Sequence, residues 1–464
     1  MIPLSVAQIA GITGARADLV ADPAALVTGP VVIDSREAGP GSLFAALPGT
    51  RADGHDYAAG ALAAGATAVL ATRPVGGPAL IVPGVPGALA ALARAVVDRL
   101  PGLTILAITG SAGKTTAKDL AAQLIESLGP TVSPQSSYNN EIGHPLTVLR
   151  VTGETSYLVA EMSARGPGHI AALCRISPPR LGAVLCVGHA HAGVFGSIDE
   201  VALAKGELPA ALPARGVAVL NADDPRVLAM AGRTAARVVT FGRSPGADVR
   251  AAGVVLDEAG RPCFTLATEA GSAPVRLRLH GEHNVSNALA AAALAGQLGM
   301  DLAAVAAGLS AATARSRWRM EVTRRPDGVT IVNDAYNANP EALAAALSAV
   351  AAMARGGRGR ALAVLGYMTE LGTQAEELHE QAGRQAAQAG LAGLIVVGDE
   401  AAPMLAGAKA DPSWRGELLQ VPDAAAAAAA AERLARPGDV VLVKASRAVN
   451  LQTVALALTG ERPL

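Results

Sequence analysis

A glycine-rich turn with a lysine and two threonines follows a short apolar run. The turn consists of Gly110, Ser111, Ala112, Gly113, Lys114, Thr115 and Thr116. In such a loop the glycines let backbone N–H groups converge on phosphate oxygens, the lysine adds positive charge, and the first threonine can reach a magnesium ion. Ile108 replaces the first glycine of the G-x-x-x-x-G-K-[ST] pattern, so the loop is a shortened variant. We predict a nucleotide-phosphate site; the alternative is a tight turn with an incidental lysine.

Two further candidates follow apolar strands. Glu161 ends the run at 157–160 and would face the crevice at the carboxyl ends of parallel strands, where it could bind magnesium together with Thr115. A helix cap or a solvated acid is the alternative. His191 lies two residues after His189, a spacing that suggests zinc but lacks cysteine and carboxylate companions, so a polar loop histidine is the other interpretation.

Other polar positions fall at helix starts or strand ends. Lys205 lies in the helical stretch 201–208, where an isolated lysine is ordinarily solvated. Asn284 and Asn287 open a helix, which they could cap, or they could contact the edge of a base. Asp334 follows a short strand within a dense polar run, which indicates either a binding site or a turn rich in Asn and Pro.

The elements that must position these residues are apolar strands in alternation with alanine-rich helices, a pattern that predicts an α/β protein. A chain of 464 residues has room for about three domains of ~150 residues each. We place them at residues 1–85, 86–315 and 316–464, with a mostly parallel sheet in the central one. The alanine run at 424–431 is expected to form a surface helix.

Composition excludes several classes of function. The net charge is −1 and no long basic run occurs, so nucleic acid is not an expected partner. Gly and Pro interrupt the apolar stretches, so no membrane insertion is expected, and the N-terminus lacks a signal-peptide pattern. Cys174, Cys186 and Cys263 show neither disulfide-like nor C-x-x-C spacing, which is typical of free thiols in a reducing cytoplasm.

Taken together, these residues resemble the Mur ligase family of peptidoglycan synthesis over nearly the whole chain. Besides the phosphate loop, Glu161 and Asp334, further runs match the family in the same order along the sequence. They are Asp34-Ser35-Arg36, 44–49, 53–55, 138–143, His191 with 195–197, 204–207, His283-Asn284 with Asn287, Arg319-Met320-Glu321, 336–340, Leu365-Gly366 with 370–372, and Val443-Lys444 with Ser446-Arg447. Any one of these matches is weak, whereas so many in one order are specific.

The resemblance implies a small N-terminal α/β domain for a UDP-sugar, a central parallel-sheet P-loop ATPase domain and a C-terminal Rossmann-like domain. It also implies an ATP-dependent ligase that forms an acyl phosphate before an amine attacks. The runs 336–340 and 365–372 resemble members that add D-alanyl-D-alanine to UDP-N-acetylmuramoyl-tripeptide, the last cytoplasmic step to the pentapeptide precursor. Tyr367 stands where those members usually carry an acid, and Ala445 where glycine is usual.

The resemblance further implies roles for the matching residues. Lys114 and a magnesium ion held by Thr115 and Glu161 would grip the β- and γ-phosphates of ATP. A second magnesium would be held by His191 and by Lys205 as its carbamate. The remaining roles are adenine for Asn140, Asn284 and Asn287, the phosphates for Arg319, the ribose for Asp334, the UDP-sugar for Ser35 and Arg36, and the peptide for Tyr336, Asn337 and Asn339. The C-terminal domain would complete the ATP site, so its closure would gate the reaction.

Two other functions remain open at this point. A sibling amide ligase, such as one that adds the third amino acid or a folylpolyglutamate synthase, shares the ATP chemistry but not the acceptor, although the Asp-Asn-Pro-Arg motif of the former is absent. A phosphate-loop ATPase without ligation would need no UDP-sugar domain, so the run Asp34-Ser35-Arg36 speaks against it. We expect a monomer in the cytoplasm, and either diaminopimelate or lysine as the third residue of the accepted peptide.

Overall fold

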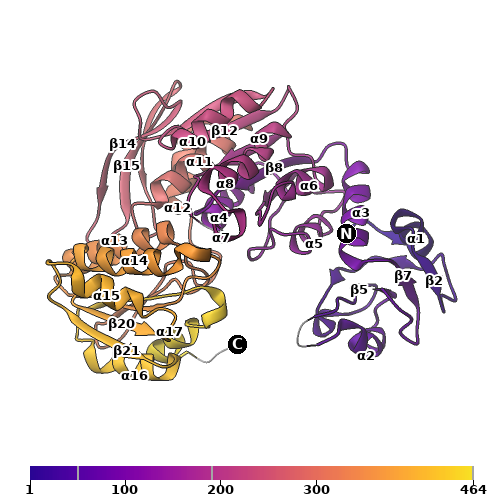
Figure 1. The fold of residues 1–464 in the computed structure, drawn as a ribbon. Helices are drawn as coiled ribbons and strands as arrows, with labels where there is room; N and C mark the ends of the chain where they lie inside the picture. Colours follow the sequence, from indigo (N-terminus) through magenta and orange to yellow (C-terminus); the bar gives the residue numbers. More distant parts are fainter. Residues whose placement is uncertain (50–51, 190–191, 462–464) are drawn as a thin grey trace.

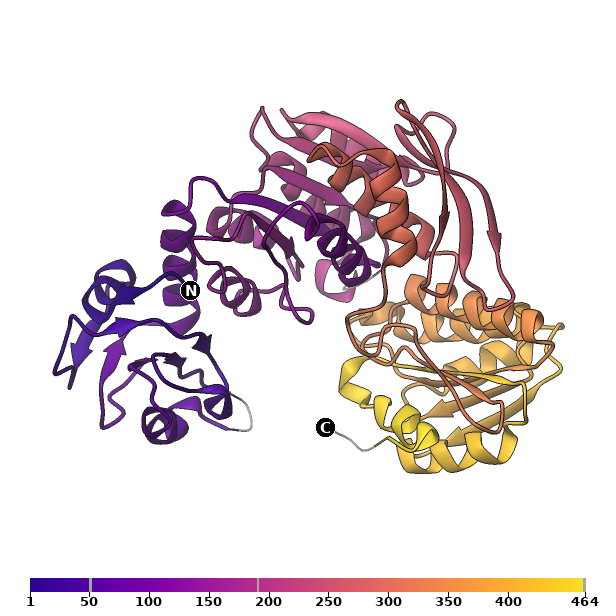
Figure 2. The same ribbon diagram turned by 180° about the vertical axis from the view of Figure 1, so that it is seen from behind.

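The computed structural model describes residues 1–49, 52–189 and 192–461 and forms an arc of three α/β units (Figure 1). Each unit is built on one main sheet, and the view from behind shows the first and last units at opposite ends of the central one (Figure 2). The sheets lie within residues 16–81, 104–276 and 321–444. The α/β class with three units is therefore confirmed. The sheets fall inside the predicted ranges 1–85, 86–315 and 316–464, whose boundaries stay a prediction.

The N-terminal unit contains a five-stranded sheet in the order β2-β7-β6-β5-β4. Strands β4 to β7 are parallel, and β2 pairs antiparallel with β7 at one edge. The strands of the unit are β1 (Leu4–Ser5), β2 (Arg16–Asp18), β3 (Leu26–Val27), β4 (Val31–Val32), β5 (Leu43–Ala45), β6 (Ala68–Ala71) and β7 (Ala79–Ile81). Its helical segments are α1 (Val6–Thr13), η1 (Ser35–Glu37), η2 (Gly54–Tyr57) and α2 (Ala58–Ala63).

Helix α3 (Val85–Asp98) joins the N-terminal and central units. Leu89 and Leu92 of this helix are fully buried and belong to one apolar cluster with Leu70 of strand β6 and Leu158 of the central sheet. Because burial of leucine side chains stabilises the contact on both sides of the helix, the two units share a continuous core.

The central unit contains a nine-stranded sheet in the order β16-β15-β14-β13-β12-β11-β8-β10-β9. Strands β9 to β14 pair in parallel through β8, whereas β14, β15 and β16 form an antiparallel extension that the sequence did not predict. The strands are β8 (Thr104–Thr109), β9 (Thr131–Val132), β10 (Tyr157–Glu161), β11 (Leu181–Val184), β12 (Val217–Asn221), β13 (Arg237–Gly242), β14 (Val249–Leu256), β15 (Pro262–Thr268) and β16 (Gly271–Arg276).

Helices cover both faces of the central sheet. They are α4 (Lys114–Ile125), α5 (Gly143–Val148), α6 (His169–Ile176), α7 (Ala192–Phe195), α8 (Ile198–Lys205), α9 (Glu207–Ala210), α10 (Pro225–Leu228), η3 (Ala229–Arg233), α11 (Asn284–Gln297) and α12 (Leu302–Ala311). Helix α11 packs on α4 in the largest apolar cluster. Its alanines are nearly all buried, and their small side chains let the two helices approach closely.

The register of the central sheet brings the two strongest sequence candidates together. Strand β10 pairs in parallel with β8, and Glu161 lies opposite Ile108. The phosphate loop that follows β8 and the carboxylate that ends β10 therefore emerge side by side at the carboxyl edge of the sheet, where open α/β proteins bind ligands.

The C-terminal unit contains a six-stranded sheet in the order β17-β18-β22-β19-β20-β21, parallel except for β17. Its strands are β17 (Glu321–Arg324), β18 (Thr330–Asn333), β19 (Ala361–Gly366), β20 (Gly393–Val397), β21 (Glu417–Val421) and β22 (Val440–Lys444). Its helices are α13 (Pro340–Gly357), η4 (Gly372–Gln374), α14 (Ala375–Gln388), α15 (Pro403–Ala410), α16 (Ala424–Leu434), η5 (Arg447–Val449) and α17 (Gln452–Thr459). The helix expected at 424–431 is confirmed as α16, with Ala427, Ala430 and Ala431 buried on one side.

Helices α14 and α15 cross at a pair of glycines. A methyl group on Gly383 would lie 1.9 Å from the carbonyl oxygen of Met404, and one on Gly407 would lie 1.9 Å from that of Glu380. No side chain fits between these backbones, so the two helices can pack this closely only through glycine.

Two other properties of the chain follow from the structure. None of the helices in its described part combines the length and apolar character needed to cross a bilayer. Cys174, Cys186 and Cys263 are free thiols, as their spacing predicts.

We predict that Gly383→Ala destabilises the protein by about 1–3 kcal/mol, because the added methyl group forces α14 and α15 apart. Gly296→Ala is the matched control, since Gly296 also lies in a helix but a methyl group added there would meet nothing within 4 Å. That variant should be neutral or more stable by about 0.5–1 kcal/mol. Calorimetric melting of both variants measures the difference; equal melting temperatures would contradict the tight crossing.

Candidate active site

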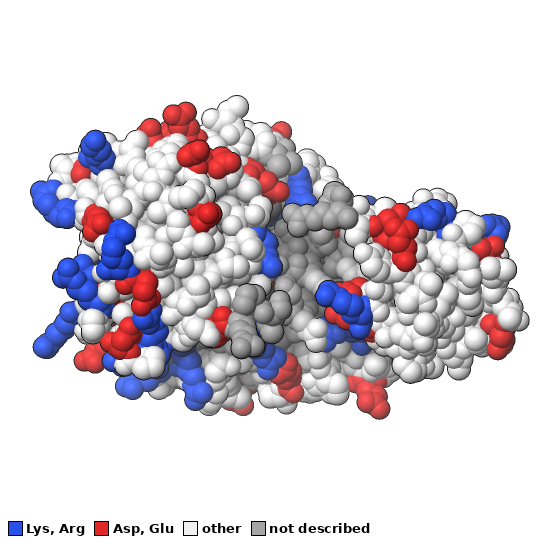
Figure 3. Space-filling view, turned by 90° about the horizontal axis from the view of Figure 1, so that it is seen from below, with Lys and Arg blue, Asp and Glu red and all other residues white. Residues whose placement is uncertain are grey.

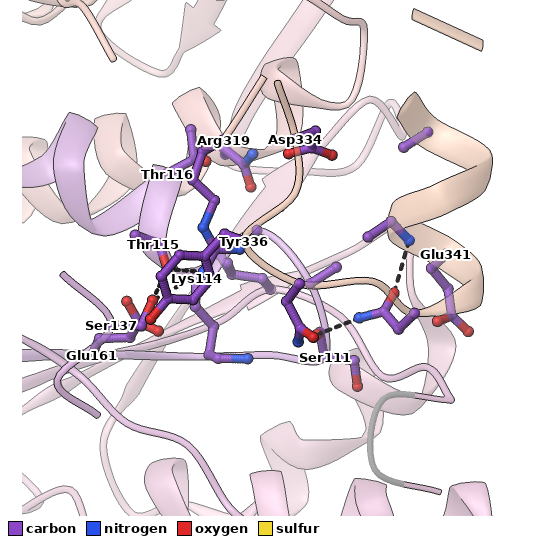
Figure 4. Close-up of a pocket in the computed structure, with 18 of the residues that line it drawn as sticks. Ser111, Lys114, Thr115, Thr116, Ser137, Glu161, Arg319, Asp334, Tyr336 and Glu341 are labelled. Carbon is purple, nitrogen blue, oxygen red and sulfur yellow. Dashed lines mark hydrogen bonds between the residues drawn. The ribbon is translucent and has the colours of Figure 1, made fainter. Parts of the chain in front are cut away.

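A cavity of about 1090 Å³ lies where the C-terminal unit meets the carboxyl edge of the central sheet. Residues of the phosphate loop, the start of α11, the segment around Arg319 and the loop after β18 line it. Seen from below, the molecule is hollowed between the C-terminal unit on the left and the N-terminal unit on the right (Figure 3). The close-up shows Lys114, Thr115, Ser137 and Glu161 grouped together, with Tyr336 among them in this view (Figure 4).

Gly113 fixes the shape of the phosphate loop. Its φ angle of 80° is in the left-handed region, and a Cβ at this position would lie 2.2 Å from Oδ1 of Asn287. Asn287 in turn donates from Nδ2 to Oδ1 of Asn284 at 2.9 Å. Only glycine satisfies both the backbone angle and the close approach of α11. Both asparagines thus brace the loop, while their expected contact with adenine stays a prediction.

Lys114 begins helix α4, next to the phosphate loop. Its Nζ donates to the carbonyl oxygen of Gly110 at 2.7 Å, which holds the ammonium group over the loop. Burial lowers the pKa of Lys114, and the nearby Glu161 carboxylate counteracts this by favouring the charged form. A cation in such a partly dry position interacts more strongly with phosphate than it would in water.

Glu161 and Thr115 present oxygen atoms to the same part of the cavity. Glu161 is 1% exposed, and its Oε1 accepts a hydrogen bond from Nδ2 of Asn139 at 2.6 Å. Its Oε2 is buried without a hydrogen-bond partner among the described residues. Thr115 Oγ1 lies 3.1 Å from Oγ of Ser137. A carboxylate oxygen left unpaired and a nearby hydroxyl are the hard donors that magnesium prefers, so these residues fit the expected ion.

Arg319 reaches the phosphate loop from the segment that leads to the C-terminal unit. Its Nη2 donates to Thr115 Oγ1 at 3.1 Å and to Ser137 Oγ at 2.9 Å. The guanidinium carbon lies 4.2 Å from the centre of the Tyr336 ring, in a cation–π contact. The structure therefore brings Arg319 to the phosphate loop, while its expected contact with the phosphates stays a prediction.

Asp334 is engaged in a buried ion pair. Its Oδ2 accepts from Nζ of Lys444 at 2.5 Å, and its Oδ1 accepts from the backbone N–H of Met320 at 3.0 Å. Lys444 also donates to the carbonyl oxygen of Asn337 at 2.9 Å. Asp334 lines the cavity but also ties three segments of the C-terminal unit together, so its expected ribose contact stays a prediction beside this structural role.

Asn339 caps helix α13, and Asn140 holds the turn that leads into α5. Asn339 Oδ1 accepts from the N–H of Ala342 at the start of α13, and its Nδ2 donates to the carbonyl oxygen of Ser111 at 3.4 Å. Asn140 Oδ1 accepts from the N–H of Gly143 at 2.8 Å, at the start of α5. Both side chains line the cavity, and the contact of Asn339 with the phosphate loop joins two units.

Lys205 ends helix α8 and is 1% exposed. Burial, together with the positive charge of Lys114, lowers the pKa of Lys205 to about 7. An amine with this pKa is largely uncharged at slightly alkaline pH, unlike an exposed lysine. The alternative of a solvated lysine is therefore wrong. His191, its expected partner at a metal, lies outside the described residues.

Ser35 and Arg36 lie apart from this cavity, in η1 of the N-terminal unit. Arg36 is 87% exposed in its side chain and forms an ion pair with Asp34 at 2.5 Å. The two residues expected to bind the UDP-sugar are therefore neighbours but lie away from the phosphate loop. Their role stays a prediction.

Sequence reasoning missed several residues of the site. Ser137 contacts Thr115 and Asn139 contacts Glu161, yet neither was named as a site residue, although Asn139 lies within the run 138–143 and Ser137 directly precedes it. Glu341 was also missed: its Oε1 accepts from the backbone N–H of His189 at 2.8 Å, which links α13 to the loop after β11. Such contacts join residues far apart in sequence and follow no local pattern.

Comparison with known proteins agrees with this geometry. Three family models match the chain: "Mur ligase family, catalytic domain" at residues 30–98, "Mur ligase middle domain" at 108–295, and "Mur ligase, glutamate ligase domain" at 318–447. The chain belongs to the Mur ligase family, as its motifs predicted.

Relatives of the chain point to one branch of this family. UDP-N-acetylmuramoyl-tripeptide–D-alanyl-D-alanine ligase, or MurF, of Mycobacterium tuberculosis is 50% identical, over 99% of this chain and 98% of the relative. Among solved structures, MurF from Acinetobacter baumannii superposes with a TM-score of 0.86 at 29% identity, covering 99% of both chains. MurF from Thermotoga maritima in complex with ADP superposes with a TM-score of 0.80 at 31% identity, covering 94% of this chain and 98% of that one.

We predict that Gly113→Ala weakens binding of ADP at least about tenfold, because the methyl group would collide with Asn287 and reshape the loop. Isothermal titration calorimetry measures the affinity. Gly102→Ala, at the other end of β8 and with nothing within 4 Å, is the control and should bind ADP as the unaltered protein does. Unchanged binding by Gly113→Ala would show that the loop does not hold the nucleotide phosphates.

Proposed function

We propose that this protein is an ATP-dependent ligase that joins D-alanyl-D-alanine to UDP-N-acetylmuramoyl-tripeptide through an acyl phosphate. The observation that carries this proposal is the meeting of a phosphate loop and the C-terminal unit in one cavity. The full-length similarity to MurF of Mycobacterium tuberculosis supports the choice of substrates. The alternatives, a sibling amide ligase and an ATPase without ligation, lack this support.

The chemical problem is electrostatic. The carboxylate of the peptide is a poor electrophile, and it must approach the γ-phosphate of ATP although both are anionic. Lys114 of α4 and Arg319 of the segment that leads to the C-terminal unit would supply positive charge to the phosphates, since both side chains lie against the phosphate loop. The carboxylate oxygen then attacks phosphorus and ADP leaves. The neutral amine of the dipeptide attacks the acyl carbon, phosphate leaves with the bonding electron pair, and the nitrogen proton passes to solvent.

Thr115 and Glu161 would hold one magnesium ion, which when bound neutralises charge on the β- and γ-phosphates. His191 and a carbamate on Lys205 would hold a second. Lys205 is suited to carbamate formation, because its buried amine is uncharged in a large fraction of molecules near pH 7. In that step the nitrogen lone pair attacks carbon dioxide, an N–C bond forms, and the nitrogen proton passes to solvent.

We propose that each part of the substrates contacts a particular group of residues. Asn140, Asn284 and Asn287 remain our candidates for adenine, and Asp334 for the ribose. Ser35 and Arg36 are proposed to bind the UDP-sugar, and Tyr336, Asn337 and Asn339 the peptide. We also propose that the enzyme acts as a monomer in the cytoplasm.

The direct test is ligation by the purified protein. With ATP, magnesium, D-alanyl-D-alanine and UDP-N-acetylmuramoyl-tripeptide, we expect phosphate release that depends on both peptides and a product heavier by one dipeptide less water in mass spectrometry. Tripeptides ending in diaminopimelate and in lysine are assayed in parallel. Phosphate release that ignores the peptides would indicate an ATPase, and transfer of single amino acids a sibling ligase.

The carbamate proposal has its own test. Lys205→Ala should lose most of its ligase turnover, because a buried ligand is removed, and short carboxylates such as acetate should restore part of it by taking the place of the carbamate. Steady-state phosphate release measures both effects. Lys409→Ala replaces an exposed lysine on α15 and is the control. Its turnover should equal that of the unaltered protein, with and without acetate. Full activity of Lys205→Ala without added carboxylate would remove the proposal.

A further inference from the structure

Helix α4 carries a row of polar side chains beyond the phosphate loop. Asp119, Gln123 and Glu126 are spaced by three or four residues, so they lie on one face of the helix, in line with Thr115. All three contact the linker (residues 312–320), which runs from the end of α12 to the start of β17. The phosphate-binding helix therefore also holds the chain segment that enters the C-terminal unit.

Two of these contacts are bidentate. The side-chain amide of Gln123 donates to the carbonyl oxygen of Thr313 at 3.0 Å and accepts from the N–H of the same residue at 3.1 Å. The Glu126 carboxylate accepts two hydrogen bonds from the guanidinium group of Arg315, one of them 2.6 Å long. Paired hydrogen bonds fix orientation as well as distance.

Asp119 makes the third contact. Its Oδ2 accepts from the backbone N–H of Ser316 at 3.1 Å, and its Oδ1 pairs with the ammonium group of Lys118. Lys118 is 1% exposed and also donates to the carbonyl oxygen of Pro134 at 2.7 Å. The segment that begins at Pro134 carries Ser137, whose hydroxyl lies beside that of Thr115. Helix α4 therefore holds the segments that carry both Ser137 and Arg319, the two residues that contact Thr115.

Directly after Ser316 the backbone of the linker adopts unusual φ angles. Trp318 and Met320 have φ angles of 58° and 51°, in the left-handed region that side chains disfavour, and they flank Arg319. The N–H of Trp318 donates to Oε2 of Glu321 at 3.2 Å, and the guanidinium group of Arg447 covers the Trp318 ring at 4.3 Å. Neighbouring contacts thus hold an unfavourable backbone that turns the Arg319 side chain toward the phosphate loop.

We propose that Asp119, Gln123 and Glu126 are positioning residues: they clamp the linker to α4 and thereby place Arg319 on the phosphate loop. Three residues of chain span at most roughly 10–11 Å, so an anchor at Ser316 confines Arg319 to the neighbourhood of Thr115 however the rest of the C-terminal unit moves. Loop and arginine then act as one piece, although they come from different units. This inference rests on the proposed function only for its kinetic readout.

The Glu126–Arg315 pair offers a reversible test, because both side chains are partly exposed, at 38% and 42%. In Glu126→Arg and in Arg315→Glu, like charges face each other and should loosen the clamp. We expect kcat to fall about tenfold in each, with KM for ATP changed less than about twofold, since Lys114 and the loop glycines are intact. The double variant E126R/R315E restores opposite charges and should recover kcat to within about threefold.

Hydrogen exchange supplies a readout that needs no ligase activity. The amides of Thr313 and Ser316 are held by side chains of α4, so peptides that cover 312–320 should exchange faster in both single variants and at the original rate in the double variant. Calorimetry with ADP should give unchanged affinity. Asp119 is not substituted, because without its carboxylate the buried ammonium group of Lys118 would lose its counter-charge.

Glu380→Arg is the matched control. Glu380 pairs with Arg384 on α14, with side chains 38% exposed on each side, so the same charge reversal is made away from the linker. It should alter neither kcat nor exchange in 312–320. The clamp would be overturned if both single variants kept the kcat and the hydrogen exchange of the unaltered protein. It would also be overturned if the double variant kept a low kcat although its melting temperature were normal. If the unaltered protein ligates nothing, the proposed function fails, and hydrogen exchange still decides this inference.

Discussion

Positive charge buried at the carboxyl edge of the central sheet is the constraint around which this molecule is arranged. Lys205 is buried and Lys114 is half-buried at the cavity, and the charge of Lys114 further disfavours protonation of Lys205. The protein tolerates this because Glu161 and the carbonyl oxygen of Gly110 lie against Lys114. An anionic ligand would stabilise these partly desolvated positive charges, so a site that is unfavourable when empty favours the binding of phosphate.

The C-terminal unit completes this electrostatic arrangement from the other side. Arg319 contacts Thr115 and Ser137, and Asn339 contacts the phosphate loop at Ser111. These contacts at the phosphate loop are polar, whereas the N-terminal and central units share an apolar core across α3. Polar contacts exchange readily with water and ligand groups, so the junction at the phosphate loop is suited to rearrange and the apolar junction across α3 is suited to stay.

Local patterns made much of the site predictable. The phosphate loop follows from a strand, glycines and a Lys-Thr pair in direct succession, and Glu161 follows from its place at the end of a strand. The burial of Lys205 was not visible in its own sequence neighbourhood, and its expected role at a metal came only from the family resemblance. Ser137 was missed, and the pairing of Asp334 with Lys444 could not be foreseen although Lys444 lies in a run that matches the family, because the fold, not the sequence spacing, makes these contacts.

The rest of the fold divides in the same way. Alternation of strands and helices predicts three α/β units, yet it does not reveal that β14, β15 and β16 extend the central sheet in the antiparallel sense. Nor does the alanine-rich pattern of the helices show that α4 contacts the linker, because Gln123 and Glu126 look like ordinary polar positions of a helix surface. Pairing across long sequence separations depends on register and packing, which composition does not encode.

The antiparallel extension has a mechanical consequence. The turn between β14 and β15 touches α13: a methyl group on Gly356 would lie 2.2 Å from the carbonyl oxygen of Glu258, and one on Gly260 would lie 2.6 Å from the side chain of Met353 (Figure 1). The C-terminal unit is thus supported at this hairpin as well as at the linker. Contacts at two separate places restrict the C-terminal unit more than the linker alone would, so rotation about the line that joins them is the motion that they hinder least.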